Sequence, residues 1–229
     1  VTAGANSQIA VNGAISGNRV DFFGGNGSGF TQGAGASIAT SGGQRLLIQT
    51  DSIALNGAAG SITGNGPVTL QPAQATTTVG LGTGAGTFGL SNAELATLSG
   101  FSSIQVGYYY DTGLVSLGGP VAFTAPTAIY SAGAGSAGIT AGAATALTAA
   151  NGGTLTLQTA GDLTTAAGST IVSGPLTLNG HNVSLGNSFT ASAGVVAGLS
   201  VTGTGNVAVG GTTSSPTRHA GFAGRGTLP

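Results

Sequence analysis

Short runs in which apolar and polar residues alternate recur along the whole chain. Each run spans a few residues and lies between Gly, Asn or Ser residues. Alternation of this kind, with leucine and β-branched side chains, is typical of strands that bury one face. No long stretch keeps a helical period. The pattern therefore predicts an all-β fold, with strands such as Ile9-Ala10-Val11, Val68-Thr69-Leu70, Leu155-Thr156-Leu157 and Val183-Ser184-Leu185.

The runs also repeat at a nearly constant spacing. Segment 153–158 reads like segment 174–179, and segment 44–49 reads like segment 66–71. Repeats of about 20 residues with drifting length are typical of a solenoid, in which stacked coils share one core. We therefore predict a parallel β-helix rod over residues 1–211 and an irregular tail over 212–229. A β-sandwich is the alternative, but sandwiches rarely contain so few bulky residues.

One segment departs from the strand pattern. Ser91 is followed at the third position by Glu94, which is the spacing of a capping box, and Leu95 and Leu98 would share one helix face. We expect a helix of one to two turns over residues 91–98, followed by a strand over 103–107.

The composition excludes several functions. The 229 residues include 45 Gly but only four Arg and five acidic residues, and there is no Lys, Cys, Met or Trp. Four cations are too few for a nucleic-acid interface, and disulfides and thiolate metal sites are impossible without Cys. No apolar run is long enough for a transmembrane helix. A surface this poor in charge suits an extracellular polymer, although a flexible Gly/Ala-rich matrix protein is a second interpretation.

The region from Thr78 to Gly118 resembles a recurrent unit of filamentous-haemagglutinin-like bacterial exoproteins. It contains the short Ser-Asn-Ala-Glu-Leu helix, then Ile-Gln-Val-Gly, then Thr-Gly-Leu-Val. The resemblance implies a right-handed parallel β-helix and an adhesive or structural role in a cell-surface fibre, after export by two-partner secretion or as an autotransporter passenger. The Asn-Pro-Asn-Gly and Asn-Pro-Asn-Leu motifs of the family's secretion domain do not occur.

The few acidic residues leave one enzymatic alternative open. A β-helix lyase or hydrolase that acts on polysaccharides would need two or three carboxylates on one face. With coils of about 20–25 residues, Asp21 and Asp51 could be neighbours on adjacent coils, with Arg19 and Arg45 close by. We prefer turn-capping and ion-pair roles for these residues, and a capping role for Glu94, so we expect no enzyme.

Other candidate sites have weaker support. His181 and His219 have no partner at metal-ligand spacing, so we expect no metal and no cofactor. Scattered Thr, as at Thr76-Thr77-Thr78, disfavours an ice-binding surface, which needs regular Thr rows. Phe22, Phe23, Phe88 and Phe101 should fill the core or cap an end.

The only aromatic cluster is Tyr108-Tyr109-Tyr110, which lies next to Asp111. We expect Tyr108 and Tyr110 to form a surface contact for a sugar or a partner. In an alternating strand, Tyr109 would point the opposite way.

The sequence predicts an extracellular, cell-surface location and self-association. A start at Val1 without a signal peptide suggests a processed piece or a segment of a longer chain. Terminal coils would expose unpaired strand edges, and a net charge of −1 would barely oppose association. We therefore expect an end-to-end filament or the continuation of a longer rod, with a host-surface or glycan ligand on its side.

Overall fold

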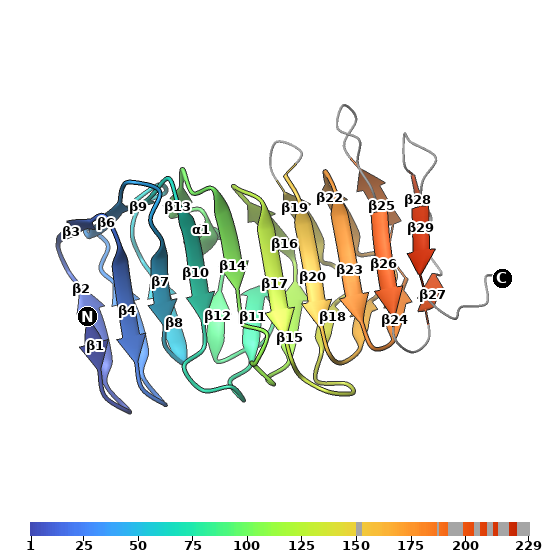
Figure 1. Ribbon diagram of the computed structural model, residues 1–229, viewed down its shortest axis with the longest axis horizontal. Coiled ribbons are helices and arrows are strands. Elements are labelled where there is room, and N and C mark those ends of the chain that lie inside the picture. Colours follow the sequence, from blue (N-terminus) through green and yellow to red (C-terminus); the bar gives the residue numbers. More distant parts are fainter. Residues whose placement is uncertain are drawn as a thin grey trace.

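A computed structural model of the chain describes residues 1–149, 153–186, 188–191, 199–203, 207–209, 213–214 and 220–223. The described strands all pair in parallel and stack into a right-handed β-helix, which confirms the predicted fold class (Figure 1). In Figure 1 the chain advances from left to right, the strands of the near face run down and those behind them run up, which makes the coil right-handed. This is the handedness that parallel crossovers prefer. Parallel pairing also excludes a sandwich of antiparallel sheets.

Three faces make up the β-helix. The first face is one ten-stranded sheet, which we call the long sheet, in the order β1-β4-β7-β10-β14-β17-β20-β23-β26-β29. Its strands are β1 (Thr2–Ala3), β4 (Val20–Gly24), β7 (Leu46–Gln49), β10 (Pro67–Gln71), β14 (Ser103–Val106), β17 (Thr127–Ser131), β20 (Leu155–Thr159), β23 (Leu176–Gly180), β26 (Leu199–Gly203) and β29 (Ala220–Ala223).

The second face consists of two sheets in line, because β8 packs beside β12. One sheet has the order β2-β5-β8, and the other has the order β12-β11-β15-β18-β21-β24-β27. The strands are β2 (Gln8–Val11), β5 (Gly29–Gln32), β8 (Ser52–Leu55), β11 (Val79–Gly82), β12 (Phe88–Leu90), β15 (Val115–Gly118), β18 (Ile139–Ala141), β21 (Leu163–Thr165), β24 (Val183–Leu185) and β27 (Val207–Val209).

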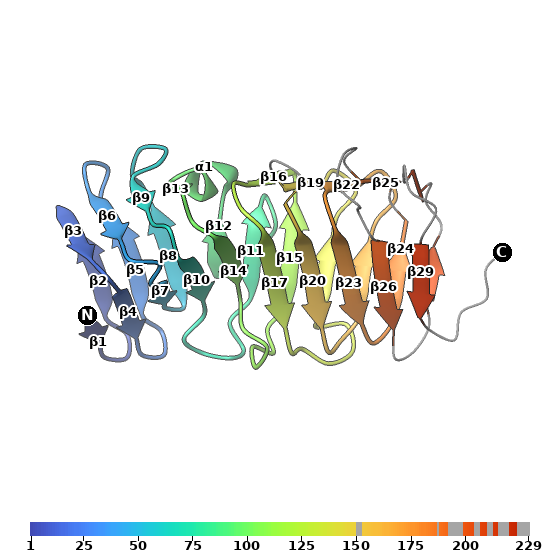
Figure 2. The ribbon, with the colours of Figure 1, turned by 45° about the horizontal axis from the view of Figure 1, so that its top comes forward.

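The third face is interrupted by the helix α1 (Asn92–Leu95), which packs against β16 (Figure 2). Its sheets have the orders β13-β9-β6-β3 and β16-β19-β22-β25-β28. The strands are β3 (Ala14–Gly17), β6 (Ser37–Thr40), β9 (Ile62–Thr63), β13 (Leu98–Ser99), β16 (Pro120–Phe123), β19 (Ala146–Ala149), β22 (Thr170–Ser173), β25 (Ser188–Ala191) and β28 (Thr213–Ser214).

The sequence repeats coincide with the register of the long sheet. Leu155 pairs with Leu176, and Leu46 pairs with Val68, which are the matching positions of the two pairs of similar segments. The longest step joins Val68 to Ile104, because β11, β12 and α1 all lie within that coil. Coil length therefore varies while the ladder stays in register, since the strands must align side by side but the turns between them can differ in length.

The core runs the length of the rod between the three faces. One inner row of the long sheet stacks a bulky apolar side chain in successive coils, and each is buried. The row comprises Phe22, Ile48, Leu70, Val106, Ile129, Leu157, Leu178 and Val201. Each coil thus covers the apolar residues of its neighbours, which a single coil could not do for itself.

The predicted capping box at α1 is confirmed, but the helix is shorter than expected. The Ser91 hydroxyl accepts a hydrogen bond from the Glu94 backbone N–H, and the Glu94 carboxylate accepts one from the Ser91 N–H at 2.8 Å. Leu98, which the sequence places on the helix, instead belongs to β13, where it pairs with Ile62. The helix ends early because continuing it would remove this ladder pair.

Glu94 also compensates for the local break in the ladder. Its Oε1 accepts a hydrogen bond from the backbone N–H of Leu55 at 3.0 Å. Leu55 ends β8, so the carboxylate satisfies a strand N–H at the place where α1 follows β12. The capping role expected for Glu94 is confirmed and is joined by this second role.

Beyond residue 211, where the sequence predicts an irregular tail, the structure describes two strands. β28 pairs with β25, and β29 pairs with β26. This part of the predicted tail therefore continues the ladders, whereas His219 lies outside the described residues. Within the described part of the chain, no helix combines the length and the apolar character that crossing a membrane requires.

Candidate binding groove

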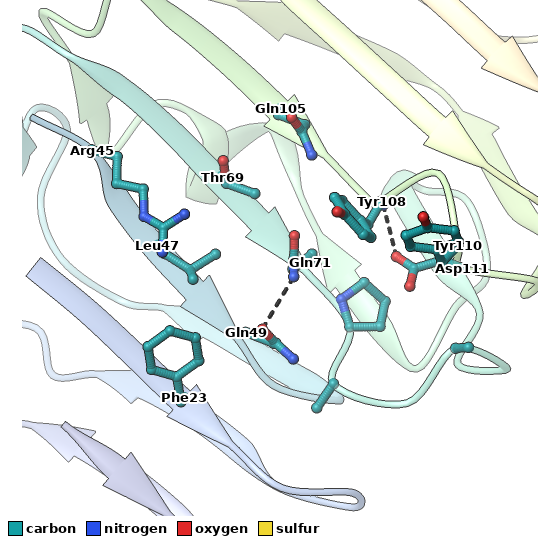
Figure 3. Close-up of a pocket in the computed structure, with 13 residues that line it drawn as sticks. Phe23, Arg45, Leu47, Gln49, Thr69, Gln71, Gln105, Tyr108, Tyr110 and Asp111 are labelled. Carbon is teal, nitrogen blue, oxygen red and sulfur yellow. Dashed lines mark hydrogen bonds between the residues drawn. The ribbon is translucent and has the colours of Figure 1, made fainter.

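An open groove of about 530 Å³ lies on the outer face of the long sheet (Figure 3). Its floor is formed by outward side chains of β4, β7, β10 and β14, and its walls by the turns that follow β10 and β14. The lining residues are Phe23, Arg45, Leu47, Gln49, Thr69, Gln71, Pro72, Ala73, Ala75, Gln105, Tyr108, Tyr110 and Asp111.

The floor of the groove is a row of amide side chains held by the ladder register. Phe23, Gln49 and Gln71 occupy equivalent positions on successive strands. Gln71 Nε2 donates a hydrogen bond to Gln49 Oε1 at 3.1 Å, which links the two side chains along the rod. Gln105 Nε2 donates to the carbonyl oxygen of Gly107 at 3.0 Å. These contacts orient the amides across the floor and leave further donors and acceptors for a ligand.

Phe23 corrects one sequence prediction. Phe22, Phe88 and Phe101 are buried as expected, and the Phe22 ring lies 4.9 Å from that of Phe30. Phe23, however, is half-buried at the groove. Adjacent residues of a strand point to opposite faces, so Phe22 and Phe23 cannot both enter the core.

The tyrosines do not continue β14, contrary to the expected alternation. The strand ends at Val106, and Gly107 follows with a φ of 73°. A Cβ on Gly107 would clash with the carbonyl oxygen of Tyr130, so only glycine fits this close approach. Tyr108 to Asp111 then form a turn in which the Asp111 N–H donates to the Tyr108 carbonyl at 2.8 Å.

The three tyrosine rings pack on one another instead of pointing in opposite directions. The ring centroids of Tyr108 and Tyr109 are 4.2 Å apart, and those of Tyr109 and Tyr110 are 4.5 Å apart. Tyr109 and Tyr110 are 52% and 66% exposed, whereas Tyr108 is half-buried. Tyr108 and Tyr110 line the groove, so the two residues expected to form a surface contact share one wall of it.

The Asp111 side chain stabilises the turn formed by Tyr108 to Asp111. One of its carboxylate oxygens accepts a hydrogen bond from the Tyr108 N–H at 2.8 Å. Burial raises the pKa of Asp111 to about 6; the Tyr108 N–H lowers it, and the nearby Asp51 carboxylate raises it further. The raised pKa places the ionisation of Asp111 about two pH units above that of an ordinary aspartate.

Asp51 anchors the opposite wall. Its Oδ1 accepts hydrogen bonds from the backbone N–H groups of Ala73 and Gln74 at 3.1 and 2.7 Å, and from the Thr77 hydroxyl at 2.8 Å. Its Oδ2 accepts one from the Gly27 N–H at 2.5 Å. A buried carboxylate with four donors is fully satisfied. Asp51 thus ties the turn after β10 to the turn after β4.

We expect Asp111→Asn to stabilise the fold at pH 7.5 and to lose that advantage in acid. The Asn side-chain oxygen can still accept from Tyr108, but the buried charge beside Asp51 is gone. The folded-state pKa lies above the unfolded value, so ionisation opposes folding above pH 6, and the penalty disappears as pH falls from about 6 to 4. Thermal unfolding of both proteins at pH 7.5 and 4.5 measures this; an equal gap at the two pH values would contradict it.

The acidic cluster considered for catalysis does not form around Asp21. Arg19 and Arg45 donate to the Asp21 carboxylate at 2.6 and 3.1 Å, whereas Asp51 lies in the turn that follows β7 and bonds to backbone groups and Thr77 instead. The groove lining contains one carboxylate, that of Asp111. Two-carboxylate glycoside hydrolysis needs a second free carboxylate on the same face, and Asp51 is fully engaged by its four donors.

Metal-binding and ice-binding arrangements are both missing from the described residues. No group of three or more His, Asp or Glu side chains comes together there at metal-binding distance. Asp162 Oδ1 instead accepts a hydrogen bond from Asn182 Nδ2 at 2.7 Å.

In the described ladders, an outward row has Thr in two successive coils at most, for example at Thr140 and Thr164. A regular Thr surface is therefore not present on these faces.

The chain matches no protein-family model, and no curated protein or solved structure shows significant similarity to it.

The sequence missed most of the groove. It expected Tyr108 and Tyr110 at the surface, assigned Phe23 to the core or an end, and did not identify the amides Gln49, Gln71 and Gln105 as site residues. A signal was present for two of them, because Gln49 and Gln71 occupy the same position in segments 44–49 and 66–71. Gln105 lies beyond the long step from Val68 to Ile104, where the constant spacing fails.

Proposed function

We propose that this chain is an extracellular structural and adhesive rod that belongs to a bacterial cell-surface fibre of the filamentous-haemagglutinin-like kind. The supporting observation is a continuous parallel ladder whose outer face is almost uncharged. Outward positions of the long sheet hold mostly Gln, Thr, Ser, Asn and Ala side chains, and the charged pairs around Asp21 lie near one end. A stiff rod with such sides suits a fibre in which function lies along the surface and no catalytic chemistry is required.

The edge formed by β1, β2 and β3 supports extension of the rod. Among the described strands, each of these three pairs on one side only, with β4, β5 and β6. In β2, the carbonyls of Ser7 and Val11 face β5, so the N–H and C=O groups of Ala10 face the other way. Such an edge accepts further parallel strands, either from a second copy or from further coils of a longer rod.

Ala10→Pro tests the contribution of a second copy. Proline removes the outward N–H of Ala10 without removing a bond to β5, because the Ala10 groups do not face β5. We expect the concentration-dependent association of the purified chain, followed by sedimentation velocity, to fall in Ala10→Pro and to persist in the control Ala10→Ser. A chain that stays monomeric at high micromolar concentration would contradict self-association.

Location and form are tested on the native material. Antibody labelling of intact cells and imaging of the labelled material should show the chain on the surface, within elongated fibres. Labelling that appears only after the cells are opened, or isolated globular particles, would overturn the proposed function.

A further inference from the structure

The exposed rings of the rod concentrate at the groove. Among the described residues, the large apolar or aromatic side chains that are mostly exposed are Val1, Tyr109 and Tyr110. Tyr108 and Phe23 add half-buried rings to the same hollow. On a surface otherwise made of small polar residues, a cluster of rings marks a place where a ligand can pack. The groove thus has apolar faces available for stacking.

Two charged side chains of opposite sign, Arg45 and Asp111, line the groove. Arg45 shares the Asp21 carboxylate with Arg19, and Asp111, which is 7% exposed, accepts a hydrogen bond from the Tyr108 N–H. The accessible polar groups are the amides of Gln49, Gln71 and Gln105 and the phenol hydroxyls. The lining has one positive and one negative side chain, so a charged chain of either sign would meet a like charge, whereas an uncharged ligand with many hydroxyls matches the amide donors and acceptors.

The floor of the groove argues against an extended peptide. Peptides that add to a sheet use the unpaired backbone of an edge strand. The floor strands β7 and β10 are interior strands, each paired on both sides, so their backbone groups are already bonded within the sheet. Recognition must therefore come from side chains, through ring faces and amides.

A second hollow extends the groove along the rod. It has a volume of about 270 Å³, shares Gln105 with the first hollow, and continues past Tyr130 to Thr156 on β20. Together the two hollows cross the strands from β4 to β20, roughly 24 Å at the usual strand spacing. The site is therefore elongated along the rod, and it suits an oligomer rather than a single small molecule.

We propose that the outer face of the long sheet binds an uncharged oligosaccharide chain lying along the rod axis, with sugar rings packed on Tyr108 and Tyr110 and hydroxyls bonded to Gln49, Gln71 and Gln105. The apolar C–H face of a sugar ring covers the aromatic faces, and its hydroxyls replace water on the amides. This inference rests on the proposed function, because it supplies the ligand for the adhesive side of the rod.

The test uses the purified full-length chain and a panel of neutral gluco-, manno-, galacto- and N-acetylglucosamine oligomers, with oligogalacturonate as an acidic comparison. Binding is measured by calorimetry and by tyrosine fluorescence, which no Trp obscures. We expect at least one neutral oligomer to bind, and longer oligomers to bind more tightly than the disaccharide. Absence of binding to every neutral oligomer, or preference for the acidic one, would overturn the proposal.

Variants locate the site. Tyr110→Ala and Gln71→Ala should each weaken binding about tenfold, the loss expected for one stacking or hydrogen-bonding group. Tyr110→Phe keeps the ring and should retain most of the affinity, and Thr177→Ala, on the outer face of β23 beyond both hollows, should not change it. Circular dichroism checks that each variant folds, which is expected because Tyr110 is 66% exposed. Equal binding by Tyr110→Ala, Gln71→Ala and the wild type would place the ligand elsewhere and overturn the proposed site.

The outcome is separable from that of the proposed function. A chain that forms surface fibres but binds no neutral oligosaccharide overturns this inference alone. A chain that binds the sugar through Tyr110 and Gln71 but is found only inside cells overturns the proposed function alone.

Discussion

Asp51→Ala is expected to lower the free energy of unfolding by about 3–5 kcal/mol. The substitution leaves the N–H groups of Gly27, Ala73 and Gln74 and the Thr77 hydroxyl without their acceptor. Unsatisfied buried donors cost about 1–3 kcal/mol each, and solvent will reach some of them once the turns loosen. Denaturant unfolding gives the total loss, and hydrogen exchange at residues 73–77 shows whether the groove wall opens.

A matched control separates the buried carboxylate from an exposed ion pair. Asp21→Ala removes two ion pairs whose arginine side chains are 53% and 40% exposed. Such surface pairs contribute about 0–1 kcal/mol. We therefore expect Asp21→Ala to cost at most about 1 kcal/mol and to leave exchange at residues 73–77 unchanged. Equal losses in the two variants would show that Asp51 does not anchor the turns as its hydrogen bonds indicate.

The repeating part of the fold could be predicted because residues that lie one sequence repeat apart are the residues that pair in the ladder. Where the coils keep the constant spacing, as from Leu155 to Leu176, the sequence repeat places each inward side chain correctly. The capping box at Ser91 and Glu94 was also predictable, since it depends only on residues within one helical turn. The second role of Glu94, on the Leu55 N–H, depends on a contact 39 residues away, which no local pattern records.

The groove depends on turns whose lengths the ladder does not control. Asp51 and Asp111 come close enough to interact from turns that are far apart in the sequence, on either side of the long coil that holds α1. A constant coil length instead placed Asp51 beside Asp21. It also fails across the long step from Val68 to Ile104, so it cannot relate residues before that step to residues after it. The tyrosine turn was missed because Gly107 resembles the many other glycines in the sequence. Its role follows from the close approach of the Tyr130 carbonyl, which is visible only in the stacked coils.

Leu70→Ala should be the most damaging of the simple core truncations on the long sheet. Leu70 is fully buried in the inner row between Ile48 and Val106, at the strand where the longest coil begins. Truncating a buried leucine costs about 2–5 kcal/mol, because the lost contacts leave a cavity that neighbours fill only in part. The backbones on both sides are held in a parallel ladder, so we expect little collapse and a loss near the upper end.

The same substitution should also change how the rod unfolds. In a stacked array each coil is stabilised mainly by its neighbours, so weakening one interface separates the coils on its two sides. We expect Leu70→Ala to convert a single denaturant transition into two, with early loss of protection in β4 and β7 and later loss in β17 and β20, as followed by hydrogen exchange. Thr69→Ala, the outward neighbour on the same strand, should cost at most about 0.5 kcal/mol and keep one transition. A single transition in Leu70→Ala with a loss below about 1 kcal/mol would mean that the inner row does not couple the coils, and that the ladder hydrogen bonds alone hold the rod together.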